Sequence, residues 1–366
     1  MACRGRAATV SHFGVVDAYR PAHQAVPEIG GFTMGTHWRV RAGGLHDADP
    51  SALRTGIEAI FDRIIVQMSP WQPDSWLSGY NGAVAGSLVA VPVETAGVLA
   101  AGIEIARQTG GAFDPAIGAL VELWGFGAAE RRTTVPEPAE IDAARACSGW
   151  QRLRFEPVAT GGRLLQPGGL RLDLSGIAKG HAVDQLADHL VALGLKDCLV
   201  EIGGEWAARG LRPDGSPWRI GVDGLLPDVN GRVPGVPLRN AAIASSGDVW
   251  HGFEHGGRRY GHTIDPRSGW PADERIEAVS VVDRQCLRAD ALATALLVLG
   301  PEEGPAFAGA QGIAALFRLR GNAGSEVGGK TEGDAGGVVR TATFERWLAD
   351  EAAPNEAFTE VAGRCS

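Results

Sequence analysis

The chain has 366 residues, of which 45% are hydrophobic and 21% are charged, a composition typical of a globular protein with a substantial core. Its 43 acidic and 34 basic residues give a net charge of -9 without any Lys/Arg cluster, which argues against nucleic acid as a partner. No run of 18 apolar residues occurs, so we expect no integral membrane segment.

The five cysteines are odd in number, and no two have C-x-x-C spacing, so neither a zinc site nor a disulfide framework is indicated. Reduced thiols fit a cytoplasmic protein best. The first 30 residues contain no continuous apolar stretch of the kind that a signal peptide has. We therefore expect a cytoplasmic protein as the sequence stands, with export as the alternative if the true start lies upstream.

The patterning along the chain predicts a loosely ordered lead-in over 1–30, a single domain over 31–350 and a loose tail over 351–366. The domain begins with a predicted strand at 31–41, where apolar and polar residues alternate. The elements that follow are predicted helices at 50–68 and 94–109, a short helix at 139–146, strands at 152–155 and 163–165, a helix at 181–193, strands at 198–201, 218–222, 241–245 and 278–282, and a helix at 290–299. A Gly-rich flexible excursion is predicted at 321–337, followed by a last strand at 340–347.

The segment 260–271 is the most informative stretch of the sequence. Its Asp-Pro-Arg-Ser-Gly core predicts a tight turn, because proline presets φ and Gly269 can adopt a positive φ. His262 stands just before this turn and titrates near neutrality, which suits a general base. The alternative is a histidine that only hydrogen-bonds within a loop.

The segment 173–180 predicts a strand that turns into a helix through small residues, with Lys179 as a nearby cation. Free N–H groups at a helix N-terminus suit a phosphate group. The glycine spacing differs from that of a Walker A loop. The alternative is that Gly176 and Gly180 only permit close packing of the helix.

Asp290 and Thr294 are four residues apart on a predicted helix and therefore share one face. A carboxylate and a hydroxyl on that face can both reach a hard cation such as Mg²⁺. The alternative is a helix-dipole partner and a core threonine.

Three further segments carry candidate binding residues, each with a packing role as the alternative. The turn 111–115 can present its backbone to a planar base, with Asp114 accepting a ligand N–H or capping the next turn. Trp71 and Trp76 flank a polar turn and can stack on a flat ring. Glu201 and Glu205 bracket a double glycine, either at the lip of a site or in solvent.

Eight short motifs, in this order, make the chain resemble the ApbE family of FAD:protein FMN transferases over about residues 30–320. The matching stretches are Met34-Gly-Thr36, Met68-Ser69 with Pro73-Asp-Ser75 and Asn81, 111–115 running to Leu123-Trp-Gly125, 172–174 through Lys179-Gly180 and Asp184, 201–205, 243–247, 262–266 with Ser268-Gly269, and 289–294. Each motif is weak alone, but the ordered set is specific.

The resemblance implies an α+β fold with a mixed, mainly antiparallel sheet core and flanking helices, similar to a T-fold. It also implies an enzyme that binds FAD with Mg²⁺. This enzyme would pass the FMN half of FAD to a Ser or Thr hydroxyl of an acceptor flavoprotein and release AMP. The same site could instead hydrolyse FAD to FMN and AMP, or hold FAD without catalysis as a carrier.

Position by position, the resemblance implies roles for most of the candidate residues. Asp290, Thr294 and the carbonyl of Gly176 would bind Mg²⁺, and His262 would be the base. FAD would be contacted by Met34, Trp71, Ala112, Phe113, Asp114, Asp173, Lys179 and Ile264. The chain departs from the family at Trp71 and His181, where tyrosine is common, and at Ser245, where threonine is common.

Overall fold

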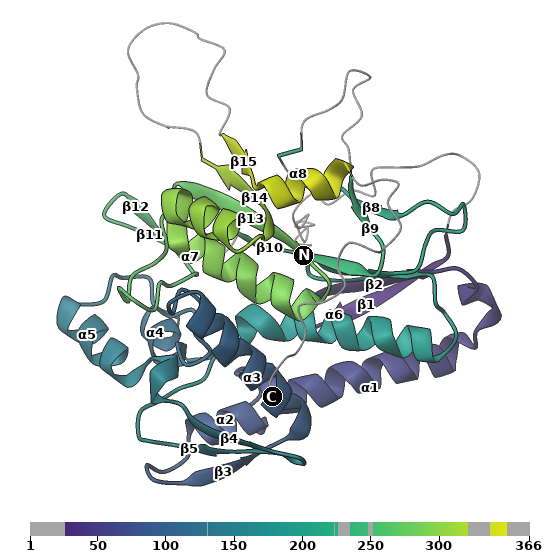
Figure 1. The fold of residues 1–366 in the computed structure, drawn as a ribbon. Helices are drawn as coiled ribbons and strands as arrows, with labels where there is room; N and C mark the ends of the chain where they lie inside the picture. Colours follow the sequence, from purple (N-terminus) through teal and green to yellow (C-terminus); the bar gives the residue numbers. More distant parts are fainter. Residues whose placement is uncertain are drawn as a thin grey trace, which may run out of the picture.

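The computed structural model describes residues 26–129, 131–222, 224–225, 235–247, 252–320 and 337–349. At its centre lies an eight-stranded sheet with the order β1-β2-β6-β7-β10-β13-β14-β15 (Figure 1). Its strands are β1 (Glu28–Thr33), β2 (Thr36–Ala42), β6 (Cys198–Ile202), β7 (Glu205–Arg209), β10 (Ala241–Gly247), β13 (Ile276–Asp283), β14 (Ala314–Leu319) and β15 (Val338–Arg340). The predicted α+β class with a mainly antiparallel core is confirmed, and every strand pair among the described residues is antiparallel.

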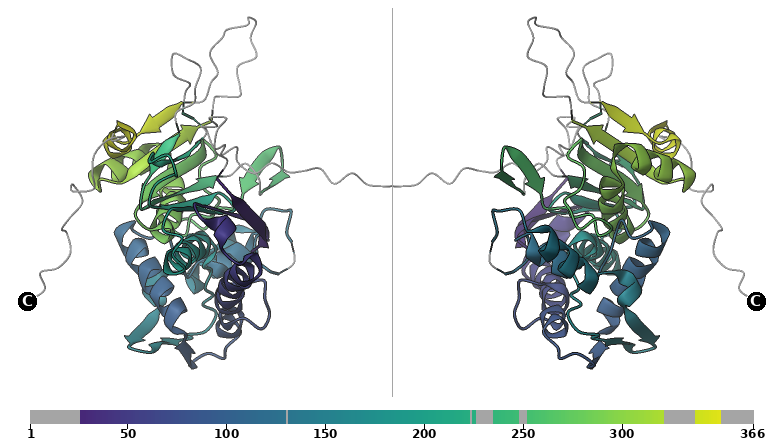
Figure 2. Two further views of the ribbon diagram at one scale, coloured as in Figure 1. Left: turned by 90° about the vertical axis from the view of Figure 1, so that its right-hand side faces the viewer. Right: turned by 90° about the vertical axis from the view of Figure 1, so that its left-hand side faces the viewer.

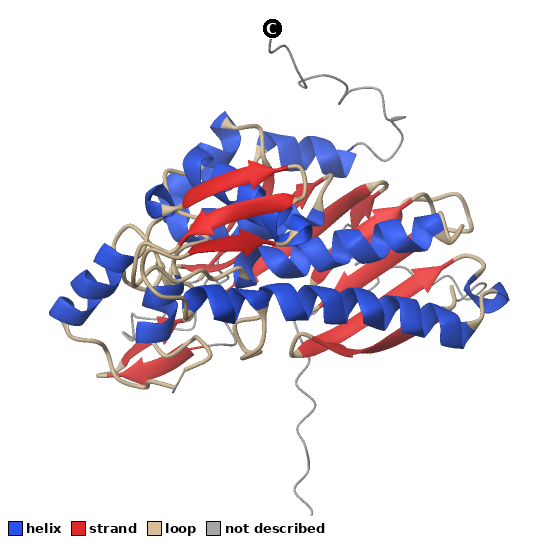
Figure 3. Ribbon diagram, turned by 90° about the horizontal axis from the view of Figure 1, so that it is seen from below, coloured by secondary structure: helices blue, strands red, loops and turns tan. Residues whose placement is uncertain are grey.

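Helices cover one face of this sheet (Figure 3). Helices α6 (Ser175–Ala192) and α7 (Cys286–Ala310) lie directly on the strands, and α1 (Pro50–Met68) packs against α6 and against β2, where Phe61 contacts Trp38. The other face is covered by α8 (Ala342–Ala349) and the pair β8 (Trp218–Ile220) and β9 (Val236–Leu238). Because successive strand residues point to opposite faces, Val200 joins the core under the helices and Leu199 joins the second core.

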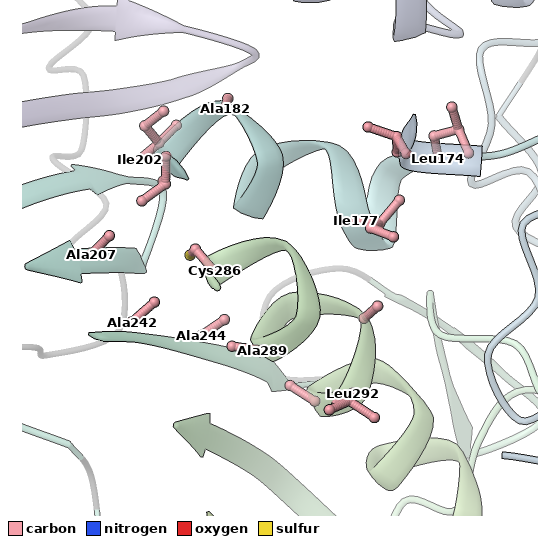
Figure 4. Close-up of a cluster of buried hydrophobic side chains, with 14 of the residues drawn as sticks. Leu174, Ile177, Ala182, Ile202, Ala207, Ala242, Ala244, Cys286, Ala289 and Leu292 are labelled. Carbon is pink, nitrogen blue, oxygen red and sulfur yellow. The ribbon is translucent and has the colours of Figure 1, made fainter. Parts of the chain in front are cut away.

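Small residues let α6 and α7 pack closely together near the start of α7 (Figure 4). A methyl group on Gly180 would lie 2.4 Å from the carbonyl oxygen of Cys286 and 2.8 Å from Cβ of Asp290, so glycine is required there. The carboxylate of Asp184 on α6 accepts the N–H groups of Cys286 and Leu287, each at 3.0 Å. This contact caps the free N-terminus of α7 and fixes the two helices relative to each other.

A second region packs beside the helical layer and contains a three-stranded sheet of order β3-β5-β4. Its elements are β3 (Leu88–Val91), β4 (Arg154–Val158), β5 (Gly161–Leu165), α2 (Trp76–Asn81), α3 (Val93–Gln108), α4 (Gly118–Leu123) and α5 (Pro138–Cys147). The side chain of Asn81 both donates to the carbonyl and accepts the N–H of Leu172, which fastens α2 to the chain that leads into α6. A separate hairpin of β11 (Gly252–His255) and β12 (Arg258–Gly261) projects from the body of the molecule, as the side views of Figure 2 show.

Two predicted strands are wrong in detail. The stretch 31–41 is a hairpin, and residues 28–30 of the predicted lead-in belong to its first strand. Met34 and Gly35 both have positive φ (48° and 75°), as a two-residue hairpin turn requires, but Met-Gly is not a usual signal for that turn. The predicted last strand at 340–347 is mostly helix α8, because the Thr341 hydroxyl accepts the N–H of Phe344 and starts a helix there.

Two predicted helices are longer than the pattern indicated. The helix expected at 181–193 begins at Ser175, and the helix expected at 290–299 begins at Cys286. The second one continues to Ala310 across a break at Gly300 (φ 83°), which lets Pro301 start a new helical segment. The excursion residues 321–336, the tail and most of the lead-in lie outside the described residues. No helix within the described ranges is both long and apolar enough to cross a membrane.

Candidate active site

Near the N-terminal halves of α6 and α7, two buried carboxyl groups meet a partly exposed lysine. Lys179 on α6 donates to Oε1 of Glu205 on β7 at 2.5 Å. Asp290 on α7 is only 4% exposed, and its Oδ2 accepts the N–H of Gly180 at 2.9 Å. The pKa of Asp290 is raised by burial, and the Lys179 ammonium and the Gly180 N–H oppose that shift. The cluster therefore holds two buried carboxyl groups around one ammonium.

Glu205 belongs to this cluster, although its sequence context fits both the lip of a site and a solvent-exposed position. It is 1% exposed, and its Oε2 is buried without a hydrogen-bond partner among the described residues. Burial raises the pKa of Glu205, with the Lys179 ammonium opposing. Burial by itself would lower the pKa of Lys179, but the carboxylates of Glu205 and Asp290 outweigh it and raise that pKa. In the sequence, the position of Glu205 directly after Gly203-Gly204 indicates a candidate site residue. Only the fold shows that its side chain faces α6.

Thr294 and Gly176 meet one helical turn from Asp290. A methyl group on Gly176 would lie 3.3 Å from Oγ1 of Thr294, and that oxygen lies 3.0 Å from Oγ of Ser246 on β10. Asp290 and Thr294 are spaced by four residues on α7, so both face the start of α6.

The predicted Mg²⁺ ligands are compatible with this arrangement. A carboxylate, a hydroxyl and a backbone carbonyl are the hard oxygen donors that Mg²⁺ takes, and the missing side chain of Gly176 leaves room beside Thr294. The described residues contain no group of three or more His, Cys, Asp or Glu side chains suited to a metal. A cation held by Asp290, Thr294 and the Gly176 carbonyl would take one carboxylate from this set of ligands, which leaves positions for water and a phosphate-bearing ligand.

The turn 111–115 reaches the same place. A methyl group on Gly176 would also lie 3.3 Å from Cε2 of Phe113, and the N–H of Asp173 donates to the carbonyl of Pro115 at 3.0 Å. Asp173 also accepts the N–H of Ser175 through Oδ1 at 2.8 Å, at the start of α6. The predicted base-binding turn and the predicted phosphate-binding turn are therefore neighbours in the structure.

Asp114 caps this turn. It is 6% exposed, its Oδ1 accepts the N–H of Ala116 at 2.7 Å, and its Oδ2 accepts the N–H of Trp150 at 2.9 Å. The packing alternative for Asp114 is thus present in the structure, whereas its predicted contact with a ligand stays a prediction. Burial raises the pKa of Asp114 to about 6, against the opposing effect of these two N–H groups.

We expect Asp114→Asn to change how stability depends on pH. The folded-state pKa is raised, so the stabilising contribution of protonated Asp114 is complete below about pH 4 and is lost as the pH rises through about 6. Relative to Asp114→Asn, the wild type should lose about 2–3 kcal/mol of unfolding free energy over that window. Urea titrations at pH 4, 5, 6 and 7 measure the unfolding free energy of both proteins. The prediction would be contradicted if the difference in unfolding free energy between the wild type and Asp114→Asn were the same at all four pH values.

His262 directly follows β12 and stands before the predicted turn, which is confirmed. Gly269 has φ 78°, its N–H donates to the Asp265 carbonyl at 2.8 Å, and the Asp265 carboxylate accepts the N–H of Arg267. Arg267 also donates to the carbonyl of Val298 on α7 at 3.4 Å. Since Val298 is one helical turn beyond Thr294, the segment that carries His262 is fastened to the same helix as the predicted metal ligands.

The remaining predicted residues lie on separate segments. Ile264 is 3% exposed in the apolar cluster beneath the hairpin β11–β12 and forms a bridge with Pro271. Met34 is in the β1–β2 turn, and Trp71 is 65% exposed between α1 and α2. Within the described part of the chain, Met34 and Trp71 make no side-chain hydrogen bond or ring contact with the Lys179 cluster. Their contact with FAD stays a prediction.

Two surface depressions lie away from these residues. One, of about 480 Å³, is lined by His189 and the start of α1, and the other, of about 580 Å³, lies between α1, α3 and α6. None of the predicted site residues lines either of them. The convergence of polar groups between α6, α7 and β7 marks the candidate site.

Fold and site together define an α+β protein with an oxygen-rich, lysine-containing cluster between two helices on an antiparallel sheet. The model of the ApbE family matches residues 34–317, so the chain belongs to the ApbE family. The resemblance drawn from the motifs is confirmed.

Relatives and solved structures agree with this family. The chain is 38% identical over 304 residues to the FAD:protein FMN transferase of Vibrio cholerae serotype O1, covering 82% of this chain and 89% of the relative. It is 31% identical over 290 residues to the FAD:protein FMN transferase of Escherichia coli K12, covering 79% and 83%. The apo structure of the Pseudomonas stutzeri flavinyl transferase ApbE matches with a TM-score of 0.76 and 39% identity, covering 88% of this chain and 97% of that one.

Proposed function

We propose that this chain is an FAD:protein FMN transferase that uses Mg²⁺ and passes FMN to a Ser or Thr hydroxyl of an acceptor flavoprotein. Membership of the ApbE family and the names of its relatives support the transferase activity and FAD as the substrate. The observation that carries the metal dependence is the meeting of Asp290, Thr294 and Gly176 beside Lys179.

The reaction exchanges one phosphorus–oxygen bond for another. The acceptor hydroxyl oxygen bonds to the phosphorus of the FMN half, and the bond from that phosphorus to the bridging oxygen breaks, so AMP leaves with the bridging oxygen. A bound Mg²⁺ would neutralise the negative charge that develops on the diphosphate.

The residues of the chain would divide the remaining tasks. Asp290, Thr294 and the Gly176 carbonyl would hold the cation, and the Lys179 ammonium would face the diphosphate as a second positive charge. The imidazole of His262 would accept the proton of the acceptor hydroxyl. Phe113 and Asp114, in the turn beside Asp173, would border the ligand.

The test is a labelling reaction with FAD, Mg²⁺ and a candidate acceptor domain. We expect flavin fluorescence that stays on the acceptor after denaturation, one AMP released for each flavin attached, and no reaction in EDTA. Free FMN together with AMP would identify an FAD pyrophosphatase instead. Bound FAD without AMP release would identify a non-catalytic carrier.

A further inference from the structure

The aromatic residues at the C-terminal end of α4 contact the chain on both sides of His262. Trp124 is buried and stacks on Tyr260, two residues before His262, with ring centroids 5.6 Å apart. Its Nε1 donates to the carbonyl of Gly269 at 2.9 Å, in the turn that follows His262. Phe126 contacts the imidazole itself, with centroids 6.4 Å apart and an angle of 75° between the rings.

The backbone fixes the direction of Phe126. The N–H of Gly125 donates to the carbonyl of Glu122 at 3.0 Å, and the N–H of Phe126 donates to the carbonyl of Val121 at 3.1 Å. With φ 75° at Gly125, these two bonds form the Schellman motif that ends α4. A methyl group on Gly125 would lie 2.1 Å from the backbone nitrogen of Arg132, so this end of the helix requires glycine.

A second contact holds the Phe126 ring from the hairpin. Phe126 stacks on Phe253 with centroids 6.0 Å apart, and Phe253 stacks on Tyr260 with centroids 5.4 Å apart. Phe253 and Tyr260 are also paired across β11 and β12. The ring of Phe126 therefore lies between the hairpin and the imidazole, and both its backbone and its neighbours restrict its position.

We propose that Phe126 is a positioning residue for His262, whose T-shaped ring contact sets the orientation of the imidazole toward the acceptor hydroxyl. This inference rests on the proposed function, in which His262 takes the proton. A general base acts only when its nitrogen is within hydrogen-bond reach of that proton. A displacement of about 1 Å can cost a factor of about 100 in rate.

The test compares Phe126→Leu, Phe126→Tyr and Phe155→Leu in the labelling reaction. Leucine keeps apolar volume but removes the ring, so kcat should fall about tenfold while KM for FAD stays near the wild-type value. Phe126→Tyr keeps the aromatic ring and should therefore retain most of the wild-type kcat. Phe155 is a partly buried phenylalanine in the separate three-stranded sheet, so Phe155→Leu is the matched control and should retain the wild-type kcat.

A wild-type kcat in Phe126→Leu would overturn the inference, and the proposed function would stand if His262→Ala were still inactive. An equal loss of kcat in Phe155→Leu would also overturn it, because the loss would then reflect general destabilisation. If His262→Ala itself labelled at the wild-type rate, the proposed role of His262 would fail and this inference with it.

Discussion

His262→Ala is expected to lower the rate of flavin transfer by about 10²–10⁴-fold, the usual contribution of a general base. FAD binding should remain close to that of the wild type, because the candidate diphosphate contacts come from α6 and α7, and Ile264, the predicted FAD contact after β12, is unchanged in this variant. Fluorescence of the denatured acceptor measures the transfer, and titration of FAD fluorescence measures the binding.

The matched control is His255→Ala. His255 ends β11 in the same hairpin, but its side chain is exposed at the tip. This variant should label at the wild-type rate. Equal labelling by His262→Ala and the wild type would refute the role of base. A loss of FAD binding in His262→Ala would show that the imidazole has a different role, in the binding of the substrate.

Asp290→Asn is expected to weaken Mg²⁺ binding and Mg²⁺-dependent transfer. The loss should exceed the roughly 10–100-fold that follows when a residue outside the first coordination sphere of a metal is substituted, because Asp290 would bind the metal directly. The amide oxygen can still accept the N–H of Gly180, so the packing of α6 on α7 should persist. Removing a buried charge should leave the thermal midpoint no lower than that of the wild type. Magnesium titrations of the labelling rate, together with thermal unfolding, measure both effects.

Asp184→Asn is the comparison for this experiment. Asp184 is also a carboxylate between α6 and α7, but it caps the N-terminus of α7 with both oxygens. An amide can accept only one of the two N–H groups through its oxygen, so stability should fall by about 1 kcal/mol. The magnesium dependence should be unchanged. The assignment of Asp290 as a metal ligand would be wrong if both variants showed the same magnesium requirement as the wild type.

The sequence predicted the backbone conformation of the site motifs well where that conformation depends on residues that are adjacent in the chain. The turn after His262 is an example, because Asp265, Pro266 and Gly269 each have a local conformational preference that the structure satisfies. Predictions were poorer where a local signal was absent or overridden. Met34 adopts a positive φ because the strands on either side pair and require it, and 342–349 forms a helix after the Thr341 cap.

By itself, the sequence determined the residue types available for chemistry and, through its ordered motifs, the family and the class of fold that the family resemblance implies. Only the tertiary structure decided that Glu205 is buried against Lys179, that Gly180 donates to Asp290, and that Phe126 contacts His262. These contacts join residues that are 26, 110 and 136 positions apart, and no local pattern encodes such pairs. They exist because the sheet, the helices and the β11–β12 hairpin must pack together to bury their apolar faces.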